Sequence, residues 1–405
     1  MGPARLDARG IAERFARVRP LVERVDIVLR EPPDVAVLVE PDARRARVEA
    51  IAESIAEVLE RRPGFAARFD YGWATDPDGY DDVWDAVLQH VVIVTLSEID
   101  DDHPDLERLN PVVVKSVRSV SFASVCVPGA DVDFICISRA FQGFLQAFVG
   151  TLLDLRDAAR GLDDTTATWC RGNALHGRDA ERALRAGGDE TEQLVDTLLG
   201  SAMRLSAGRP VRHARSVGPR LYAEIERVNP FLAEAYLSCE GFVVCHELAH
   251  LLRRHRFDVH RDVRREREAD QAALSLMTIA SACVEWMATG LFAGPALFIQ
   301  VSRVYDLGRR VQEGVDAGHV DMETIVPPAD ELTARGVAIV RAIPGLGTPP
   351  VVQQLVQQLI DELHVILAAC QRAVLRELGH ARPFADFLPE REAFVAGGFT
   401  AQEDV

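Results

Sequence analysis

The sequence predicts a mostly helical α+β protein in which a small antiparallel sheet or hairpin lies beside one strongly apolar helix. Two observations predict this class. Apolar residues recur at the spacing of an amphipathic helix through most of the chain, whereas 110–138 is a run rich in Val, Phe, Ile and Ser with strand character. The chain has 405 residues, of which 48% are hydrophobic, so it can bury a sizeable core and is not expected to be disordered.

The N-terminal region, 1–108, is expected to combine helices with strands. Apolar residues at helical spacing predict helices at 11–19, 42–62 and 81–98. Two β-like runs, at 22–29 and 34–39, lie between the first two helices and are separated by Pro32-Pro33. We therefore expect a separate N-terminal α/β region.

The central region, 109–290, is expected to form the core that carries the chemistry. The segment SFASVCV-PGAD-VDFICIS reads as two strands joined by a turn, which predicts a β-hairpin, and an apolar helix follows at 139–155. An insertion at about 156–228 is the least hydrophobic part of the chain, with one short helix near 189–205. This insertion is either an inert surface segment or a lid over a site.

The remainder of the chain reads as helical. Asn229-Pro230 supplies a cap and a first-turn proline for a long helix that ends near Arg256, and another helix is expected from 262 to about 289. The C-terminal helical region, 291–405, is expected to contain helices at 296–316, 328–343 and 350–378. The apolar stripe of the 350–378 helix either packs within the chain or pairs with a second copy.

One apolar stretch, 271–302, raises the question of a membrane span. Its only charge is Glu285, but this residue and Gly294-Pro295 interrupt the run of about 20 apolar residues that a spanning helix needs. We therefore expect a buried core helix and a turn, and no membrane association.

The charge and cysteine content exclude several classes of protein. The chain carries 45 Lys+Arg and 62 Asp+Glu, a net charge of −17, so nucleic acid is not an expected partner. The 7 cysteines form no C-x-x-C pair, which argues against a disulfide scaffold or a cysteine-based zinc knuckle. The amino-terminal segment contains no apolar core of a signal peptide, so a reducing cytoplasm is the expected location.

The residues that point to chemistry lie in the sequence CHELAHLL, which contains H-E-x-x-H inside a strongly apolar helix. Residues i and i+4 lie on one helix face, so His246 and His250 can converge on one tetrahedral Zn²⁺. Glu247 projects near the open coordination position, where a general base is needed. Buried histidines and glutamates need such a reason, because burying polar groups is costly.

A catalytic zinc needs a third protein ligand. A metzincin would place a histidine where this chain has Arg256, so that subclass is excluded. The sequence EREAD begins 16 residues after His250, which allows the first helix to end and a second to return alongside. Glu266 is thus the expected third ligand, and Asp270, on the same face, is expected to accept the spare N–H of a ligating histidine.

Other polar residues near the motif are expected to stay outside the site. His255 lies about 140° round the helix from His250 at about 100° per residue, so we expect it not to share the metal. Glu268 points away from the face shared by Glu266 and Asp270, and we expect it to face solvent. Arginines also cluster at 253–267, where they would favour an acidic stretch of substrate or partner.

HELAH followed by EREAD resembles the gluzincin zinc metallopeptidases. It is most similar to those whose second motif reads E-x-x-A-D, the CAAX prenyl proteases and their soluble relatives, and the Lit-like phage-exclusion peptidases are a further group that it resembles. The predicted hairpin is also similar to the one that precedes the zinc helix in the CAAX group. The resemblance covers about 110–290 and implies a zincin-like core with ligands His246, His250 and Glu266, base Glu247 and a supporting role for Asp270.

Two features depart from that resemblance. The His-Pro that those families often carry later in the chain is here Val326-Pro327, which leaves the oxyanion-stabilising residue unassigned. The transmembrane helices of the CAAX group have no counterpart.

The predicted function is a zinc-dependent, narrow-specificity cytoplasmic metallopeptidase that hydrolyses a peptide bond by a metal-activated water, with Glu247 as general base. Its partner would be a protein or peptide substrate, which could add as a strand to the edge of the hairpin. Two alternatives stay open. One is a zinc hydrolase or biosynthetic enzyme that acts on a non-protein amide, and the other is a non-catalytic zinc-binding interaction protein. Glu247 argues against the latter, because a structural zinc site has no use for a base.

Overall fold

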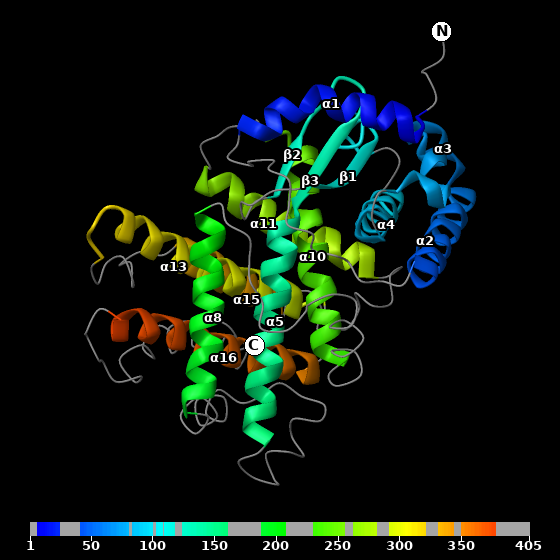
Figure 1. Ribbon diagram of the computed structural model, residues 1–405. Coiled ribbons are helices and arrows are strands. Elements are labelled where there is room, and N and C mark those ends of the chain that lie inside the picture. Colours follow the sequence, from blue (N-terminus) through cyan, green and yellow to red (C-terminus); the bar gives the residue numbers. More distant parts are fainter. Residues whose placement is uncertain are drawn as a thin grey trace. The chain divides into compact units, whose positions relative to one another are not determined.

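The computed structural model describes residues 6–24, 41–80, 83–99, 103–107, 109–117, 124–160, 188–207, 230–255, 262–281, 291–320, 331–343 and 350–377 (Figure 1). This part of the chain is mostly helical and contains one three-stranded sheet, which confirms the predicted α+β class. The chain divides into two compact units, Met1–Phe141 with Glu240–Ala288, and Gln142–Cys239 with Thr289–Val405.

The first unit opens with four α-helices and two short 3₁₀ helices. They are α1 (Ala8–Arg24), α2 (Pro41–Arg61), α3 (Pro63–Phe69), η1 (Tyr71–Thr75), η2 (Pro77–Gly79) and α4 (Val83–Ser97). Pro63 separates α2 from α3 because proline fits the first turn of a helix and not its interior. The three helices predicted for this region are confirmed.

One prediction for this region is wrong. The β-like run at 22–29 begins with residues 22–24, and these continue α1. Ile11, Val18 and Val22 are buried at helical spacing, so their packing along one helix face overrides the strand preference of a short apolar run. The rest of that run and the one at 34–39 lie outside the described residues.

The sheet contains strands β1 (Val112–Val117), β2 (Ser124–Val127) and β3 (Asp133–Ser138) in the order β1-β3-β2. β2 and β3 form the predicted hairpin, with Val125 opposite Cys136. β1 pairs with the other side of β3 in parallel, so the sheet is mixed rather than purely antiparallel. Every residue of β3 is buried, as expected for a central strand.

The hairpin turn depends on one glycine and one aspartate. A Cβ at Gly129 would overlap the carbonyl oxygen of Val132, so the turn has no room for a side chain at this position. Asp133 accepts hydrogen bonds from the backbone N–H of Gly129 (3.0 Å) and of Asn110 (3.1 Å). These bonds hold the starts of β1 and β3 together.

Helix α4 covers the outer edge of the sheet at β1, as Figure 1 shows. The side chain of Gln89 donates to the carbonyl of Val112 (3.0 Å) and accepts from the N–H of Val114 (2.9 Å), and Asp85 accepts from the N–H of Ser116 (2.8 Å). Asp85 and Gln89 are i and i+4 on the helix and therefore reach the same strand. They satisfy backbone groups that an exposed edge would leave unpaired.

Two further helices complete the described part of the first unit. They are α10 (Pro230–Leu252), which belongs to this unit from Glu240 onward, and α11 (Val263–Ser281), which packs against α4. The sequence predicts that the first of these extends to about residue 256, but it ends at Leu252 because Arg254 adopts a left-handed conformation, with φ of 54°.

The described elements of the second unit are all helices. Besides the first part of α10, it contains α5 from Gln142 onward (the whole helix is Arg139–Arg160), α8 (Gly188–Ser206), α13 (Ala293–Asp316), α15 (Glu331–Ala342) and α16 (Pro350–Glu377). α13 packs against α8, α15 and α16. A Cβ at Gly308 of α13 would lie only 2.5 Å from the Cβ of Ala202 of α8, so this glycine allows the two helices to approach closely. The rest of the predicted 156–228 insertion, apart from the end of α5 and α8, lies outside the described residues.

The apolar stripe of α16 is buried within the chain. Val356, Leu359, Leu363 and Ile366 are all 0% exposed. In the described part of the chain, no helix has both the length and the hydropathy needed to cross a membrane. The apolar 271–302 run belongs partly to α11 and partly to α13, and 282–290, with Glu285, lie outside the described residues.

Candidate metal centre

The candidate metal centre is built on the buried part of α10. The residues around the H-E-x-x-H motif, Phe242, Val244, Cys245, Leu248 and Ala249, are all 0% exposed. This helix segment is therefore buried, and the motif side chains lie in the same buried environment. His246 is 5% exposed and Glu247 is 6% exposed.

Three predicted ligands come together at this point. The Nε2 atoms of His246 and His250 lie 3.1 Å apart. Glu266 of α11 faces both rings, with Oε2 3.4 Å from Nε2 of His246 and Oε1 3.7 Å from Nε2 of His250. In a tetrahedral zinc site with bonds of about 2.05 Å, neighbouring ligand atoms lie about 3.3 Å apart. The spacing of the three donors thus fits a metal ion, which this group could hold.

Asp270 lies behind His246, as the sequence predicts. Its Oδ1 is 3.0 Å from Nδ1 of His246, an ion-pair distance. Burial alone would lower the pKa of His246, but the carboxylates of Asp270 and Glu266 outweigh it and raise this pKa to about 9. The metal-free centre therefore holds a proton on His246, with two carboxylates beside it.

His250 differs from His246 in its surroundings and in the direction of its pKa shift. Burial lowers the pKa of His250, and the neighbouring rings of His246 and His255 lower it further, against the opposing charges of Glu247 and Glu266. In the metal-free centre His246 therefore tends to be protonated and His250 tends to be neutral.

His255 lies against His250, although its spacing from His250 predicts a position about 140° round the helix, and it is not among the converging donors of the described residues. The two Nδ1 atoms are 2.8 Å apart, and the rings cross at 70° with centroids 4.9 Å apart. The prediction extended the helix past its actual end. Since the chain reverses at Arg254, His255 folds back over the last turn of α10.

Two residues of the hairpin reach the expected base, and sequence reasoning missed both of them. The hydroxyl of Ser124 donates to Oε1 of Glu247 at 2.8 Å. Cys126, two residues along β2 and hence on the same strand face, also contacts Glu247, and its pKa is raised well above the ordinary value by burial and then by the charge of Glu247. The only signal in the sequence is the alternation of Ser124 and Cys126 in a strand expected beside the helix.

The arginine cluster is partly neutralised by its neighbours. Arg264 pairs with Glu268 (2.9 Å) and Arg265 pairs with Asp262 (3.5 Å). Arg253 and Arg267 are exposed. That this cluster binds an acidic stretch of substrate or partner stays a prediction.

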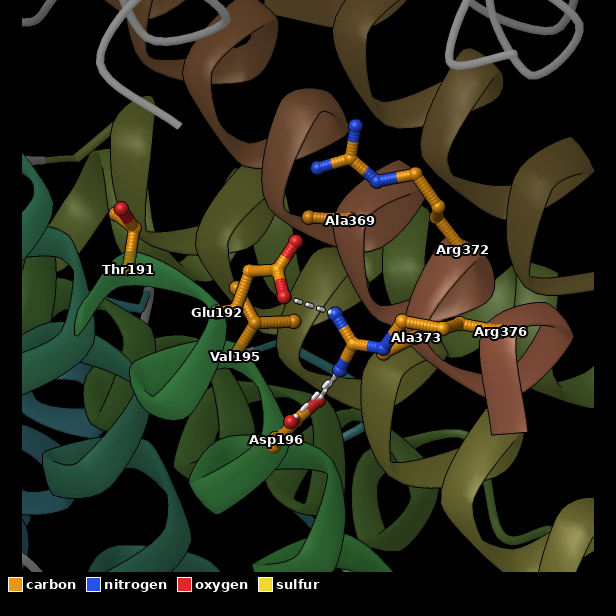
Figure 2. A pocket seen from close by; sticks show the side chains of 8 residues that line it. All are labelled: Thr191, Glu192, Val195, Asp196, Ala369, Arg372, Ala373 and Arg376. Carbon is orange, nitrogen blue, oxygen red and sulfur yellow. Dashed lines mark hydrogen bonds and ion pairs between the residues drawn. The ribbon is translucent and has the colours of Figure 1, made fainter. Parts of the chain in front are cut away.

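A pocket in the second unit offers no comparable chemistry (Figure 2). It lies between α8 and α16, and Arg376 extends across it to Glu192 (2.5 Å) and Asp196 (2.8 Å). These ion pairs satisfy the charged groups of Glu192, Asp196 and Arg376.

Comparisons with known proteins found no matching family model, no similar curated protein and no similar solved structure.

Proposed function

We propose that this protein is a zinc-dependent metallopeptidase whose centre is formed by His246, His250 and Glu266, with Glu247 as general base. One observation carries the proposal. The ligand atoms of the three residues all lie within 4.8 Å of one another, on two helices that the H-E-x-x-H and E-x-x-A-D motifs predict to meet. A resemblance confined to sequence would not require this convergence.

The donor set favours zinc and a catalytic site. Two imidazoles and one carboxylate are the ligands of a catalytic zinc, whereas structural zinc sites use four protein ligands, mostly cysteines. The five described free cysteines include Cys245, which adjoins His246 but is not part of the group. Three protein ligands leave one position open for water or substrate.

The residues of the chain divide the chemistry between them. A bound zinc ion supplies a Lewis acid that lowers the pKa of water and polarises a carbonyl group. Glu247 takes the proton of the attacking water and passes it to the amine nitrogen as the C–N bond breaks. The hydroxyl of Ser124 donates to Oε1 of Glu247 and holds this carboxylate in place.

The substrate that fits this centre best is an extended peptide. β2 is an edge strand of the sheet, and its residues Ser124 and Cys126 contact the base. A peptide that added to such an edge would present its backbone carbonyls next to the centre. We place the reaction in the cytoplasm, where thiols such as those of the described cysteines stay reduced.

The test compares the full-length chain with its Glu247→Gln variant, both loaded with zinc, on a peptide mixture from digested cell protein. Mass spectrometry should detect new peptide termini with the wild type, and these should fall at least about 100-fold in the variant because the general base is lost. Bound zinc should be unchanged. The control is Glu53→Gln, an exposed residue of α2 in the same unit.

The outcomes separate the three functions that the sequence leaves open. Equal cleavage by wild type and Glu247→Gln would remove Glu247 as the base. Zinc binding without cleavage of any peptide, but with hydrolysis of small amides, would indicate the non-protein hydrolase. Zinc binding without any hydrolysis would indicate the interaction protein.

A further inference from the structure

Helix α10 ends in a capping motif that its sequence does not predict. The N–H of Arg254 bonds to the carbonyl of Leu251 (3.1 Å) and the N–H of His255 bonds to the carbonyl of His250 (3.0 Å). These are the two bonds of a Schellman motif, which requires a left-handed residue, usually glycine. Here Arg254 takes that conformation, with φ of 54°. The motif fixes the backbone of His255 one turn back along the helix, beside His250.

This cap brings two imidazoles together through their Nδ1 atoms, 2.8 Å apart. Nε2 of His250 faces Glu266 and His246, so Nδ1 is the nitrogen that a metal would leave free. The opposite nitrogen of His255, Nε2, lies 3.5 Å from Oε2 of Glu268, and Glu268 accepts a hydrogen bond from Arg264 (2.9 Å). A continuous series of polar contacts thus runs from Arg264 at the surface to His250.

We propose that His255 is a positioning residue for the metal centre. His250 donates its Nδ1–H to Nδ1 of His255, and His255 carries its own proton on Nε2, directed at Glu268. This arrangement fixes the tautomer of His250 that presents Nε2 to the metal, and it holds the ring in orientation. The inference rests on the proposed metal site, and it assigns to Glu268 the task of orienting His255.

The proposal gives each ligating histidine its own partner on Nδ1. His246 has Asp270 of α11, and His250 has His255 of the helix cap. Such partners of ligating histidines commonly account for about 10- to 100-fold in metal affinity. His255 itself is not a ligand, because it contacts His250 on the side of the ring opposite Nε2 and is absent from the group of converging donors in the described residues.

The test uses two substitutions that separate shape from hydrogen bonding. In His255→Asn the side-chain carbonyl oxygen takes the place of Nδ1 and can still accept the proton of His250. In His255→Phe a ring of similar size remains but accepts nothing. The zinc dissociation constant of the full-length protein is measured by competition with a chromophoric chelator, and the absorption spectrum is recorded after loading with Co²⁺.

We expect His255→Phe to bind zinc about 10- to 100-fold more weakly than the wild type and to shift its Co²⁺ bands, with His255→Asn close to the wild type. Glu268→Ala, at the surface, should give a smaller loss in the same direction. The control is His103→Phe, a more exposed histidine of the same unit. Thermal unfolding of the metal-free variants shows whether each one is folded.

Equal zinc affinity of the wild type and a folded His255→Phe would overturn the positioning role, as would a loss in His255→Asn as large as in His255→Phe. These readouts need no substrate, so they separate this inference from the proposed function. A wild type that binds zinc but cleaves no peptide would overturn the proposed peptidase function and leave the positioning role of His255 intact. A wild type that binds no zinc would overturn both.

Discussion

At the scale of single residues, the surroundings shift the pKa values of the two motif histidines in opposite directions. Asp270 and Glu266 raise the pKa of His246 to about 9 against the effect of burial, whereas burial lowers the pKa of His250. The same carboxylates that would neutralise a bound cation therefore hold a proton until the cation arrives. Metal binding and proton release are coupled at His246.

This coupling predicts a pH dependence of zinc affinity. Below pH 9 zinc must displace the proton of His246, so affinity should rise about tenfold per pH unit up to about pH 9 and then level off. In Asp270→Asn the plateau should begin at lower pH, because the carboxylate that raises the pKa is gone. Chelator competition between pH 6 and pH 10 measures this. An affinity that does not change with pH, or the same plateau in Asp270→Asn, would contradict the assignment.

The same shift has a consequence for the stability of the metal-free protein. The folded-state pKa of His246 lies above its unfolded value of about 6.5, so its contribution to the free energy of unfolding is complete below about pH 6.5. It should be lost as the pH rises towards 9. Urea unfolding of metal-free wild type at both ends of this range should show the loss, and Asp270→Asn should reduce it.

Ser124 provides a second residue-scale prediction. Its hydroxyl holds one oxygen of Glu247, and a hydrogen bond to a charged group contributes about 1.5–3 kcal/mol. Ser124→Ala should therefore lower kcat by about tenfold or more and leave zinc content unchanged. Ser275→Ala, on the exposed face of α11, is the control and should change neither quantity. An unchanged kcat in Ser124→Ala would show that Glu247 is positioned by other contacts.

These residues show how far the site could be predicted from the sequence. Helix geometry places i and i+4 on one face, so His246 with His250, and Glu266 with Asp270, follow from spacing alone. Ser124 and Cys126 do not, because a strand pattern does not say which helix its face meets. His255 does not either, since its place depends on the left-handed backbone of Arg254, where no glycine signals the turn.

At the scale of elements, the cap of α10 links the fold to the metal centre. A non-glycine residue in the left-handed conformation costs about 1–2 kcal/mol relative to a right-handed one, whereas glycine adopts it freely. Arg254 therefore carries a cost that the hydrogen bonds of the cap must offset. The helix predicted to reach residue 256 ends four residues earlier for this reason.

Arg254→Gly should stabilise the metal-free protein by about 0.5–1 kcal/mol, since part of the relief is offset by the greater freedom of glycine in the unfolded chain. The neighbouring Arg253→Gly is the matched control and should destabilise by about 0.5–1 kcal/mol, because its backbone does not have positive φ. Chemical denaturation of both variants gives the comparison. A destabilised Arg254→Gly would mean that the arginine side chain, and not the backbone, maintains the cap.

The sheet, too, has features that the sequence predicts and features that it does not. The hairpin was predictable because Pro-Gly with alternating apolar residues is a local signal. The parallel pairing of β1 with β3, and the coverage of β1 by Asp85 and Gln89 of α4, depend on long-range contacts that no local pattern encodes. Helices were predicted best, since their apolar period is maintained over many residues.

At the scale of the whole molecule, the candidate centre lies within one of the two units. All three converging donors, together with Asp270, Ser124 and His255, belong to the unit formed by Met1–Phe141 and Glu240–Ala288. The three predicted segments, 1–108, 109–290 and 291–405, stay a prediction. The N-terminal helix α4 shares this unit with the centre and bonds directly to the sheet from which β2 reaches Glu247.

Part of the net charge of −17 can be related to the metal centre. Most of the acidic excess has no assigned task, but Glu247, Glu266 and Asp270 gather in the described core around two histidines. A cation at this point would neutralise a concentration of negative charge that the metal-free protein balances with a proton on His246.

The proposed metal centre is tested most directly by the zinc content of the purified full-length protein, measured by inductively coupled plasma mass spectrometry for the wild type and for Glu266→Ala. We expect one zinc per wild-type chain and loss of bound zinc from Glu266→Ala, because two imidazoles on one helix do not complete the site. A wild-type chain without zinc after incubation with the metal, or a Glu266→Ala variant that retains one full equivalent at unchanged affinity, would contradict it.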